Sequence, residues 1–213
     1  MKIELDWITT NAEQVIGDKA RVSAPENQGK DPVSLMKYLI RNQHWSPFEM
    51  ANACFKIETT RDIARQILRH RSFSFQEFSQ RYASVDKLEA ATARECRLQD
   101  TKNRQNSLPN DDSDLDEWWV QGQNIVNNSA MALYREALER GVAKEVARAL
   151  LPEGLTTSSM YMNGTIRSWL HYLQLRCDVA TQKEHRDIAN AIALELQRHI
   201  PSVMNAYLGA KGA

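Results

Sequence analysis

The chain has 213 residues, of which 42% are hydrophobic and 25% are charged, and its 27 basic residues balance its 27 acidic ones. This composition is typical of a soluble globular protein with a sizeable core, and zero net charge argues against a general attraction to nucleic acid or to a membrane. Three separated cysteines without a CxxC pair favour a reducing compartment and give no support for a zinc site. With no apolar run near ~20 residues and no signal peptide at the start, we expect a cytoplasmic protein.

The first half of the chain is predicted to contain strands and helices in alternation. Residues 1–9 and residues 50–59 each alternate as a strand. Between them, Asp31 and Pro32 begin a helix that ends near residue 42, because an N-cap acid followed by proline suits the first turn. Thr60 can cap the next helix, whose apolar positions face the core. After Arg71 the period changes to that of an extended segment, which continues through Arg81.

The second half is predicted to be mainly helical. Residues 86–112 are polar and are expected to form a flexible surface segment, with one short helix near residues 88–98. Ser113 caps a long helix that Gly141 ends. Residues 144–151 form a shorter helix, residues 155–162 form a strand or an irregular linker, and two amphipathic helices finish the chain. The stripe predicted along the long helix consists of Leu115, Trp118, Gly122, Ile125, Ser129 and Leu133. This pattern predicts a single mixed α+β domain over residues 1–213 in which helix dominates.

Residues 61–82 (RDIARQILRHRSFSFQEFSQRY) concentrate basic side chains. Arg61, Arg65 and Arg69 recur every four residues, so on a helix they form one stripe that leads into His70 and Arg71. Like charges at this spacing repel each other, so the stripe is either a solvated basic face or a site that binds an anion. Because the chain as a whole is neutral, a local cluster favours a small anionic ligand.

Two more arginines and several missing motifs narrow the choice of function. Arg148 and Arg176 lie beside apolar positions, where a guanidinium is costly unless it meets an anion or a hydrogen-bonding partner. For either one alone an internal salt bridge is the simpler interpretation, whereas several such arginines together favour forked recognition of phosphate. The histidines lack metal-binding spacing, and no nucleophile elbow, P-loop or dinucleotide glycine motif occurs, so no metal site is expected.

A longer pattern in the same stretch resembles a known family. The residues Arg69-His70-Arg71, Ser74, Glu77, Ser79, Arg81 and Tyr82 closely match the RHRxxSxNExSxRY signature of flavin-dependent thymidylate synthases. Residues 44–49, 144–152 and 167–184 resemble further segments of that family, so the resemblance covers nearly the whole chain. The chain departs from the pattern where Gln76 replaces an asparagine and Met50 a common histidine. His171 and Tyr172 stand where many members have asparagine and phenylalanine.

The resemblance implies a helix-rich single domain with a small, mostly antiparallel sheet, and an enzyme that converts dUMP to dTMP. Methylenetetrahydrofolate would supply the carbon, FAD would carry the hydride and NADPH would reduce the flavin. No cysteine nucleophile is needed in this family. The implied assembly is a homotetramer with sites shared between subunits.

Matching residue by residue carries the family's site onto this chain. Arg176 matches the arginine that favours ionisation at N3 of the uracil, since a fixed guanidinium lowers the pKa of a neighbouring imide and makes C5 more nucleophilic. The expected flavin contacts are Arg69, His70, Arg71, Glu77, Ser46, Glu49, Ser23, Thr165, Arg167 and His171. The expected dUMP contacts are Gln66, Arg69, Glu77, Phe78, Ser79, Gln80, Arg81, Arg148 and Arg176. Arg61 and Arg65 are interpreted as a solvated face.

Two other classes of protein compete with this interpretation. A nucleic-acid binding module would use the arginines on phosphates and Phe73, Phe75 and Phe78 for stacking, but the neutral charge and the acidic residues 111–117 argue against it. A purely structural oligomer would leave the arginines at apolar borders unexplained. Flavin absorbance distinguishes all three classes.

Overall fold

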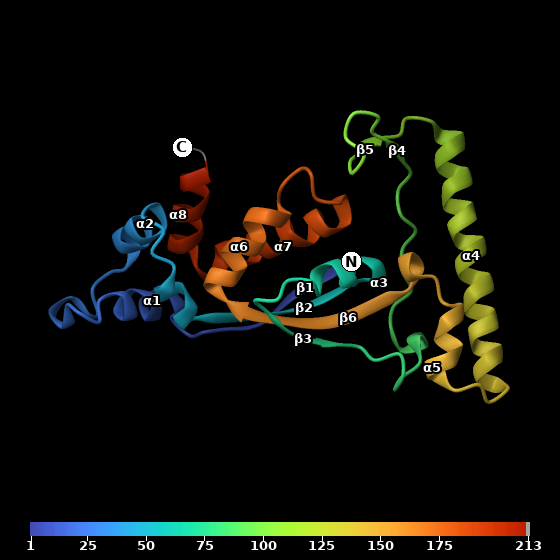
Figure 1. Ribbon diagram of the computed structural model, residues 1–213, viewed down its shortest axis with the longest axis horizontal. Coiled ribbons are helices and arrows are strands. Elements are labelled where there is room, and N and C mark those ends of the chain that lie inside the picture. The colour runs from blue at the N-terminus through green and yellow to red at the C-terminus, as the bar shows by residue number, and fades with distance from the viewer. Residues whose placement is uncertain (212–213) are drawn as a thin grey trace. The chain divides into compact units, whose positions relative to one another are not determined.

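Figure 1 shows the structure, a computed structural model that describes residues 1–211. The chain separates into two compact units. Unit 1 comprises residues 1–2, 58–69 and 77–160, and unit 2 comprises residues 3–57, 70–76 and 161 onward. The prediction of a single domain is not tested by this division and stays a prediction. The helices and strands are β1 (Lys2–Ile8), α1 (Ala12–Ala20), α2 (Val33–Arg41), β2 (Asn52–Thr60), α3 (Arg61–Ile67), β3 (Ser74–Glu77), β4 (Arg97–Gln99), β5 (Ser107–Pro109), α4 (Ser113–Glu139), α5 (Lys144–Ala147), β6 (Thr157–Thr165), α6 (Ile166–Arg176), α7 (Lys183–His199) and α8 (Pro201–Lys211).

A small antiparallel sheet has the strand order β1-β2-β6-β3. Its central strands alternate as expected of a sheet with one covered face: Ala53, Phe55 and Ile57 of β2 are 0% exposed, as are Met160 and Met162 of β6. The strand predicted for residues 50–59 is therefore confirmed. Residues 155–162 were left open between strand and linker; residues 157–162 of this range belong to β6, which continues to Thr165. The α+β fold class with a small sheet is confirmed.

The core of unit 2 is built from the helices at the end of the chain. Both amphipathic stripes predicted there are buried, with Trp169 of α6 and Ile188 and Ile192 of α7 at 0% exposure. Helix α6 packs against α7, and α8 packs against α2 and α7, as Figure 1 shows. The Trp169 indole N–H donates to the Ala53 carbonyl at 3.0 Å, which ties α6 to β2. The ring of Phe73 packs edge-on against Trp169 at 4.7 Å.

Unit 1 contains the long helix α4 and the turns that pack on it. Asp112 caps α4 by accepting from the backbone N–H groups of Asp114 and Leu115, so the cap lies one residue before the predicted Ser113. The end of the helix is as predicted, since Gly141 has φ of +86°, a conformation that suits glycine after a helix. Tyr134 of α4 packs with Val85 and Ala147 in a small hydrophobic cluster.

The stripe predicted on α4 has most of its large apolar side chains exposed. Trp118 is 66% exposed, Ile125 67% and Leu133 53%, whereas the buried positions are Gln123 and Tyr134. The amide of Gln123 accepts from the Arg94 backbone N–H and donates to its carbonyl, each at 2.9 Å, and so fixes the preceding segment on the helix. The periodicity indicates an apolar face, and most of the large apolar side chains on it are exposed within the described residues.

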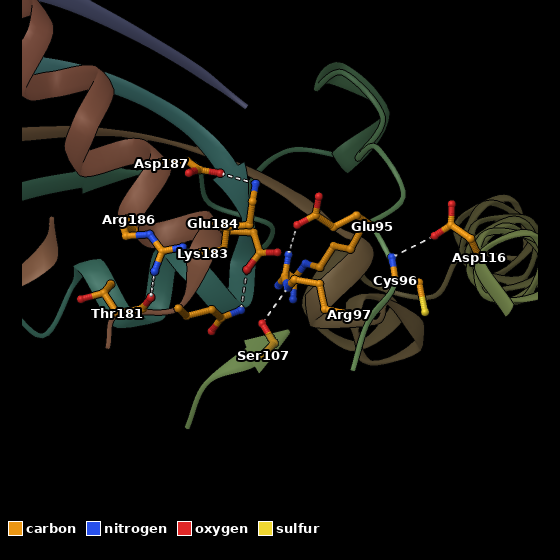
Figure 2. Close-up of polar contacts among 12 residues, drawn as sticks. Glu95, Cys96, Arg97, Ser107, Asp116, Thr181, Lys183, Glu184, Arg186 and Asp187 are labelled. Atoms are coloured by element: carbon orange, nitrogen blue, oxygen red, sulfur yellow. Dashed lines mark hydrogen bonds and ion pairs between the residues drawn. The ribbon is translucent and has the colours of Figure 1, made fainter. Parts of the chain in front are cut away.

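The helix predicted near residues 88–98 was wrong. The polar stretch instead contains the antiparallel hairpin β4–β5, in which Leu98 faces Leu108. The Arg97 guanidinium donates to the Ser107 hydroxyl at 2.9 Å and so joins β4 to β5. It also pairs with Glu95, two residues before it, at 2.8 Å. Figure 2 shows both contacts. Within residues 1–211, no helix combines the length and the apolar character needed to cross a bilayer.

Candidate functional site

A carboxylate fixed by two donors is the centre of the predicted site in unit 1. Glu77, the last residue of β3, accepts at Oε1 from the Ser158 hydroxyl at 2.6 Å and pairs with Arg61 at 3.4 Å. Ser158 is fully buried on β6, and the Arg61 side chain is only 16% exposed. The interpretation of Arg61 as part of a solvated face was therefore wrong.

The local backbone explains why these three residues meet. Arg61 is the first residue of α3, and its N–H donates to the Thr156 carbonyl at 2.9 Å, so the start of the helix is fixed beside the start of β6. The backbone N–H of Phe78 donates to the Ser159 carbonyl at 2.8 Å, which fixes the end of β3 beside the same strand. Two buried donors then converge on one oxygen of Glu77, which leaves Oε2 as the atom that can meet a ligand.

The basic stripe divides at the end of α3. Because the helix ends at Ile67, Arg69 lies beyond it and does not continue the row of Arg61 and Arg65. Arg65 pairs with Glu153 at the surface, with 59% of its side chain exposed, in agreement with a solvated face. The side-chain cap predicted for Thr60 was wrong. Its hydroxyl donates to the Asp62 carboxylate at 2.6 Å and does not cap the helix.

After β3 the chain turns, where an extended segment was predicted through Arg81. The backbone N–H groups of Tyr82 and Ala83 both donate to the Ser79 carbonyl at 3.0 Å, which closes a tight turn. In this turn Gln80 is only 4% exposed, and within the described residues its buried Nε2 has no hydrogen-bond partner. An unsatisfied buried amide is costly, so this atom is suited to donate to a bound ligand.

Arg81 and Arg148 both contact Glu145 of α5. The Arg81 guanidinium pairs with the Glu145 carboxylate at 3.2 Å, and Arg148 Nε donates to the Glu145 carbonyl at the same distance. The Arg81 side chain is 69% exposed, so this ion pair contributes little stability and can exchange for a better anion. Among the other predicted dUMP contacts, Gln66 lies on α3, and Phe78 and Ser79 follow β3.

In unit 2, His70 and Arg176 form the central contact. Arg176 Nε donates to His70 Nε2 at 2.8 Å, which requires an unprotonated Nε2 and therefore a neutral ring with its proton on Nδ1. Burial, with contributions from the charges of Arg176 and His171, lowers the pKa of His70 to about 4. The guanidinium is thus fixed beside an imidazole that stays neutral at physiological pH.

A cavity of about 370 Å³ opens elsewhere in unit 2 between α6, α8 and the turn at residues 46–50. Arg167 forms an ion pair with Glu49 in its wall, and His171, Ser72 and Trp45 also line it. A cation, hydroxyl groups and aromatic faces around an open volume of this size suit a ligand that is anionic at one end and planar at the other.

The remaining predicted flavin residues of unit 2 do not line this cavity and occupy different local positions. The Thr165 hydroxyl accepts from the Ser168 N–H at 3.1 Å and caps α6, so it already has a structural task. Ser46 begins the 3₁₀ turn that carries Glu49, and Arg71 is exposed in the turn before β3. Ser23 lies in the turn after α1.

Several residues that shape these groups had no predicted role in the site. Ser158 and Arg61 support Glu77, yet Ser158 is 81 positions away from it. Tyr172 and His185 pack against His70 with ring centroids at 4.9 and 6.2 Å. The only signal was indirect, since polar residues at core positions of predicted amphipathic elements need partners.

Neither metal nor thiol chemistry has support in residues 1–211. No cluster of three or more histidine, cysteine or acidic side chains with metal-binding geometry occurs there. Cys54, Cys96 and Cys177 form no disulfide, and burial raises the pKa of the Cys54 thiol, which makes it a poor nucleophile. A second cavity of about 330 Å³ lies in unit 1 beside α4, and no predicted site residue lines it.

Comparison with known proteins gave a consistent result. The family model described as thymidylate synthase complementing protein matches residues 5–202. The chain is 49% identical over 197 residues to a probable flavin-dependent thymidylate synthase of Paramecium bursaria Chlorella virus 1, covering 92% of this chain and 90% of that protein. It is 47% identical over 205 residues to a flavin-dependent thymidylate synthase of Synechocystis sp., covering 96% and 94% of the two chains.

Solved structures share the fold. A crystal structure of a UMP/dUMP methylase from Streptomyces cacaoi bound with 5-Br UMP superposes with a TM-score of 0.84 at 24% identity, covering 98% of this chain and 94% of the other. The same methylase bound with 5-Br dUMP gives a TM-score of 0.80 at 25% identity with the same coverage.

Proposed function

The chain belongs to the family of flavin-dependent thymidylate synthases, and on that premise we propose that it converts dUMP to dTMP by reductive methylation. Methylenetetrahydrofolate donates the carbon, and NADPH reduces a bound FAD. The observation that carries the proposal is the guanidinium of Arg176, which is fixed by a 2.8 Å hydrogen bond to a neutral His70. A permanent charge in a fixed orientation is what ionisation of a uracil imide requires.

The dUMP contacts are proposed to be Gln66, Arg69, Glu77, Phe78, Ser79, Gln80, Arg81, Arg148 and Arg176. In unit 1, Arg81 and Arg148 share Glu145 and offer two cations to a phosphate, for which arginine's planar fork is suited. The unsatisfied Nε2 of Gln80 can donate to the nucleotide, and Glu77 can accept through Oε2. These groups bind and orient the substrate, and Arg176 is the proposed catalytic residue.

The flavin contacts are proposed to be Arg69, His70, Arg71, Glu77, Ser46, Glu49, Ser23, Thr165, Arg167 and His171. The lining of the cavity in unit 2 fits such a group, because Arg167 can meet a phosphate and Trp45 can meet a planar ring. When bound, the flavin supplies the hydride for reduction of the transferred carbon. The residues of this chain hold the group in place and shield it from water.

The reaction is proposed to proceed without a cysteine nucleophile, in a cytoplasmic homotetramer with sites shared between subunits. The buried Cys54, with its raised pKa, supports the first statement. The uncovered apolar stripe of α4 supports the second, because Trp118, Ile125 and Leu133 on one helix are suited to contact another copy of the chain.

Flavin content and product formation test the proposal together. The purified protein should be yellow, release FAD on denaturation and form dTMP from dUMP. UMP should be assayed in parallel. Arg176→Ala should abolish turnover, whereas Arg198→Ala should not, since the Arg198 side chain is 73% exposed and pairs with Glu195 of its own helix. A protein that takes up no FAD, or an Arg176→Ala variant with near-normal dTMP formation, would overturn the proposal.

A further inference from the structure

Tyr172 of α6 and His185 of α7 form a polar pair inside the core of unit 2. Both side chains are 0% exposed, and the Tyr172 hydroxyl lies 3.1 Å from His185 Nε2 in a hydrogen bond. The other buried residues of α7 are apolar, and those of α6 are apolar apart from Ser168. A buried polar pair of this kind adds little stability over well-packed apolar residues, so stability alone does not explain its presence.

The pair packs directly on His70. The ring centroids of Tyr172 and His70 are 4.9 Å apart at an interplanar angle of 74°, and those of His185 and His70 are 6.2 Å apart at 88°. Phe73 lies edge-on to the same imidazole at 6.4 Å. Edge contacts from three rings restrict rotation of the imidazole about its side-chain bonds.

The orientation of His70 determines where Arg176 points. The 2.8 Å bond from Arg176 Nε requires that His70 Nε2 be a free acceptor directed at the guanidinium. If the ring turned, Nε2 would leave the plane of the donor and the guanidinium would lose its fixed orientation. The contacts therefore run from His185 through Tyr172 and His70 to Arg176.

We propose that Tyr172 and His185 are positioning residues that hold the ring of His70 in the orientation from which Arg176 acts on its ligand. Only the identity of that ligand, the uracil of dUMP, rests on the proposed function. The titratable and charged groups that face His70 are Arg176, His171, His185 and Tyr172. Burial lowers the pKa of His185 to about 3, so the pair adds no charge at neutral pH.

The first test observes His70 itself and needs no turnover. The chain has five histidines, so ring-nitrogen NMR of protein labelled at histidine can follow each of them. In the unaltered protein His70 should be the neutral tautomer with the proton on Nδ1. Tyr172→Phe keeps the ring but removes the hydroxyl that bonds His185, so the His185 ring is no longer held against His70. A second tautomer of His70 should then appear, and its pKa should rise. An unchanged tautomer and pKa would overturn the inference.

Tyr134→Phe is the matched control. Tyr134 is also 0% exposed, but its hydroxyl has no hydrogen-bond partner within the described residues and it lies in the cluster of unit 1. Its removal should leave the His70 signals unchanged. If Tyr134→Phe shifts them as much as Tyr172→Phe does, the effect is general loosening and the positioning role is rejected.

Kinetics then connect the position of His70 with activity. Tyr172→Phe and His185→Leu should each lower kcat roughly 10-fold with a smaller change in KM for dUMP, because misplacing a group that acts in the transition state reduces the chemical step first. His185→Gln, which keeps a partner for the hydroxyl, should recover most of the loss. Equal losses in the Gln and Leu variants would contradict the inference. A protein that forms no dTMP at all would refute the proposed function and leave the NMR result to decide the positioning role.

Discussion

Removing the Ser158 hydroxyl should weaken dUMP binding without unfolding the protein. In Ser158→Ala, Glu77 Oε1 loses its 2.6 Å hydrogen bond and keeps only the 3.4 Å contact with Arg61. A hydrogen bond to a charged group contributes about 1.5–3 kcal/mol. If losing the bond that positions Glu77 weakens the free energy of dUMP binding by the lower end of that range, the dissociation constant for dUMP should rise about tenfold. A change of 1.4 kcal/mol corresponds to a factor of ten.

Calorimetric titration with dUMP measures this change directly, and urea unfolding of the same sample shows whether the fold is kept. Ser159→Ala is the control, because Ser159 is the next residue on β6 and serves the site through its backbone carbonyl, which accepts from Phe78. The Ser159→Ala variant should bind dUMP with the same affinity as the unaltered protein. The reasoning is refuted if Ser158→Ala binds dUMP normally, or if both variants lose affinity to the same degree.

Three further predictions concern packing, thiols and pH. Gly164→Ala would place a Cβ 2.4 Å from Phe73 Cδ1, so urea unfolding should show a loss of about 1–3 kcal/mol or more, and a neutral result would contradict the close packing. Replacing all three cysteines with alanine should leave dTMP formation intact in a folded protein, and its loss would argue for a thiol in the reaction. His70 and His185 have folded pKa values of about 4 and 3, below the ordinary 6.5, so the unfolded chain binds more protons in acid. Stability should therefore be complete above pH 6.5 and fall between pH 6.5 and 5, by at most about 1.4 kcal/mol per pH unit for each histidine, and a flat urea midpoint over that range would refute this.

The elements with strong local patterns were predictable from the sequence. The stripes of α6 and α7 were predicted and are buried, because their periodicity reports a face that packs within the chain. The same logic identified the apolar face of α4, yet Trp118 and Ile125 are exposed. Periodicity shows which residues share a face, but not whether this chain or another copy covers it.

The candidate site was only partly predictable, because some of the residues that contact each other in it lie far apart in the sequence. The signature at residues 69–82 located Arg69, Glu77 and Gln80, but the partner that fixes Glu77 lies on β6. Arg61 was placed in a solvated stripe because helical spacing alone does not show that its side chain meets Glu77. The helix predicted near residues 88–98 was wrong because polar residues allow several conformations: residues 88–96 form neither helix nor strand, and the hairpin that Arg97 helps to join begins after them.

The most direct test of the central claim is an anaerobic experiment on the flavin-loaded protein. After the flavin is reduced with NADPH, addition of dUMP alone should leave it reduced. Addition of dUMP together with methylenetetrahydrofolate should return the absorbance of oxidised flavin and yield one dTMP for each flavin oxidised. Oxidation without dTMP, or dTMP formed while the flavin stays reduced, would contradict the account.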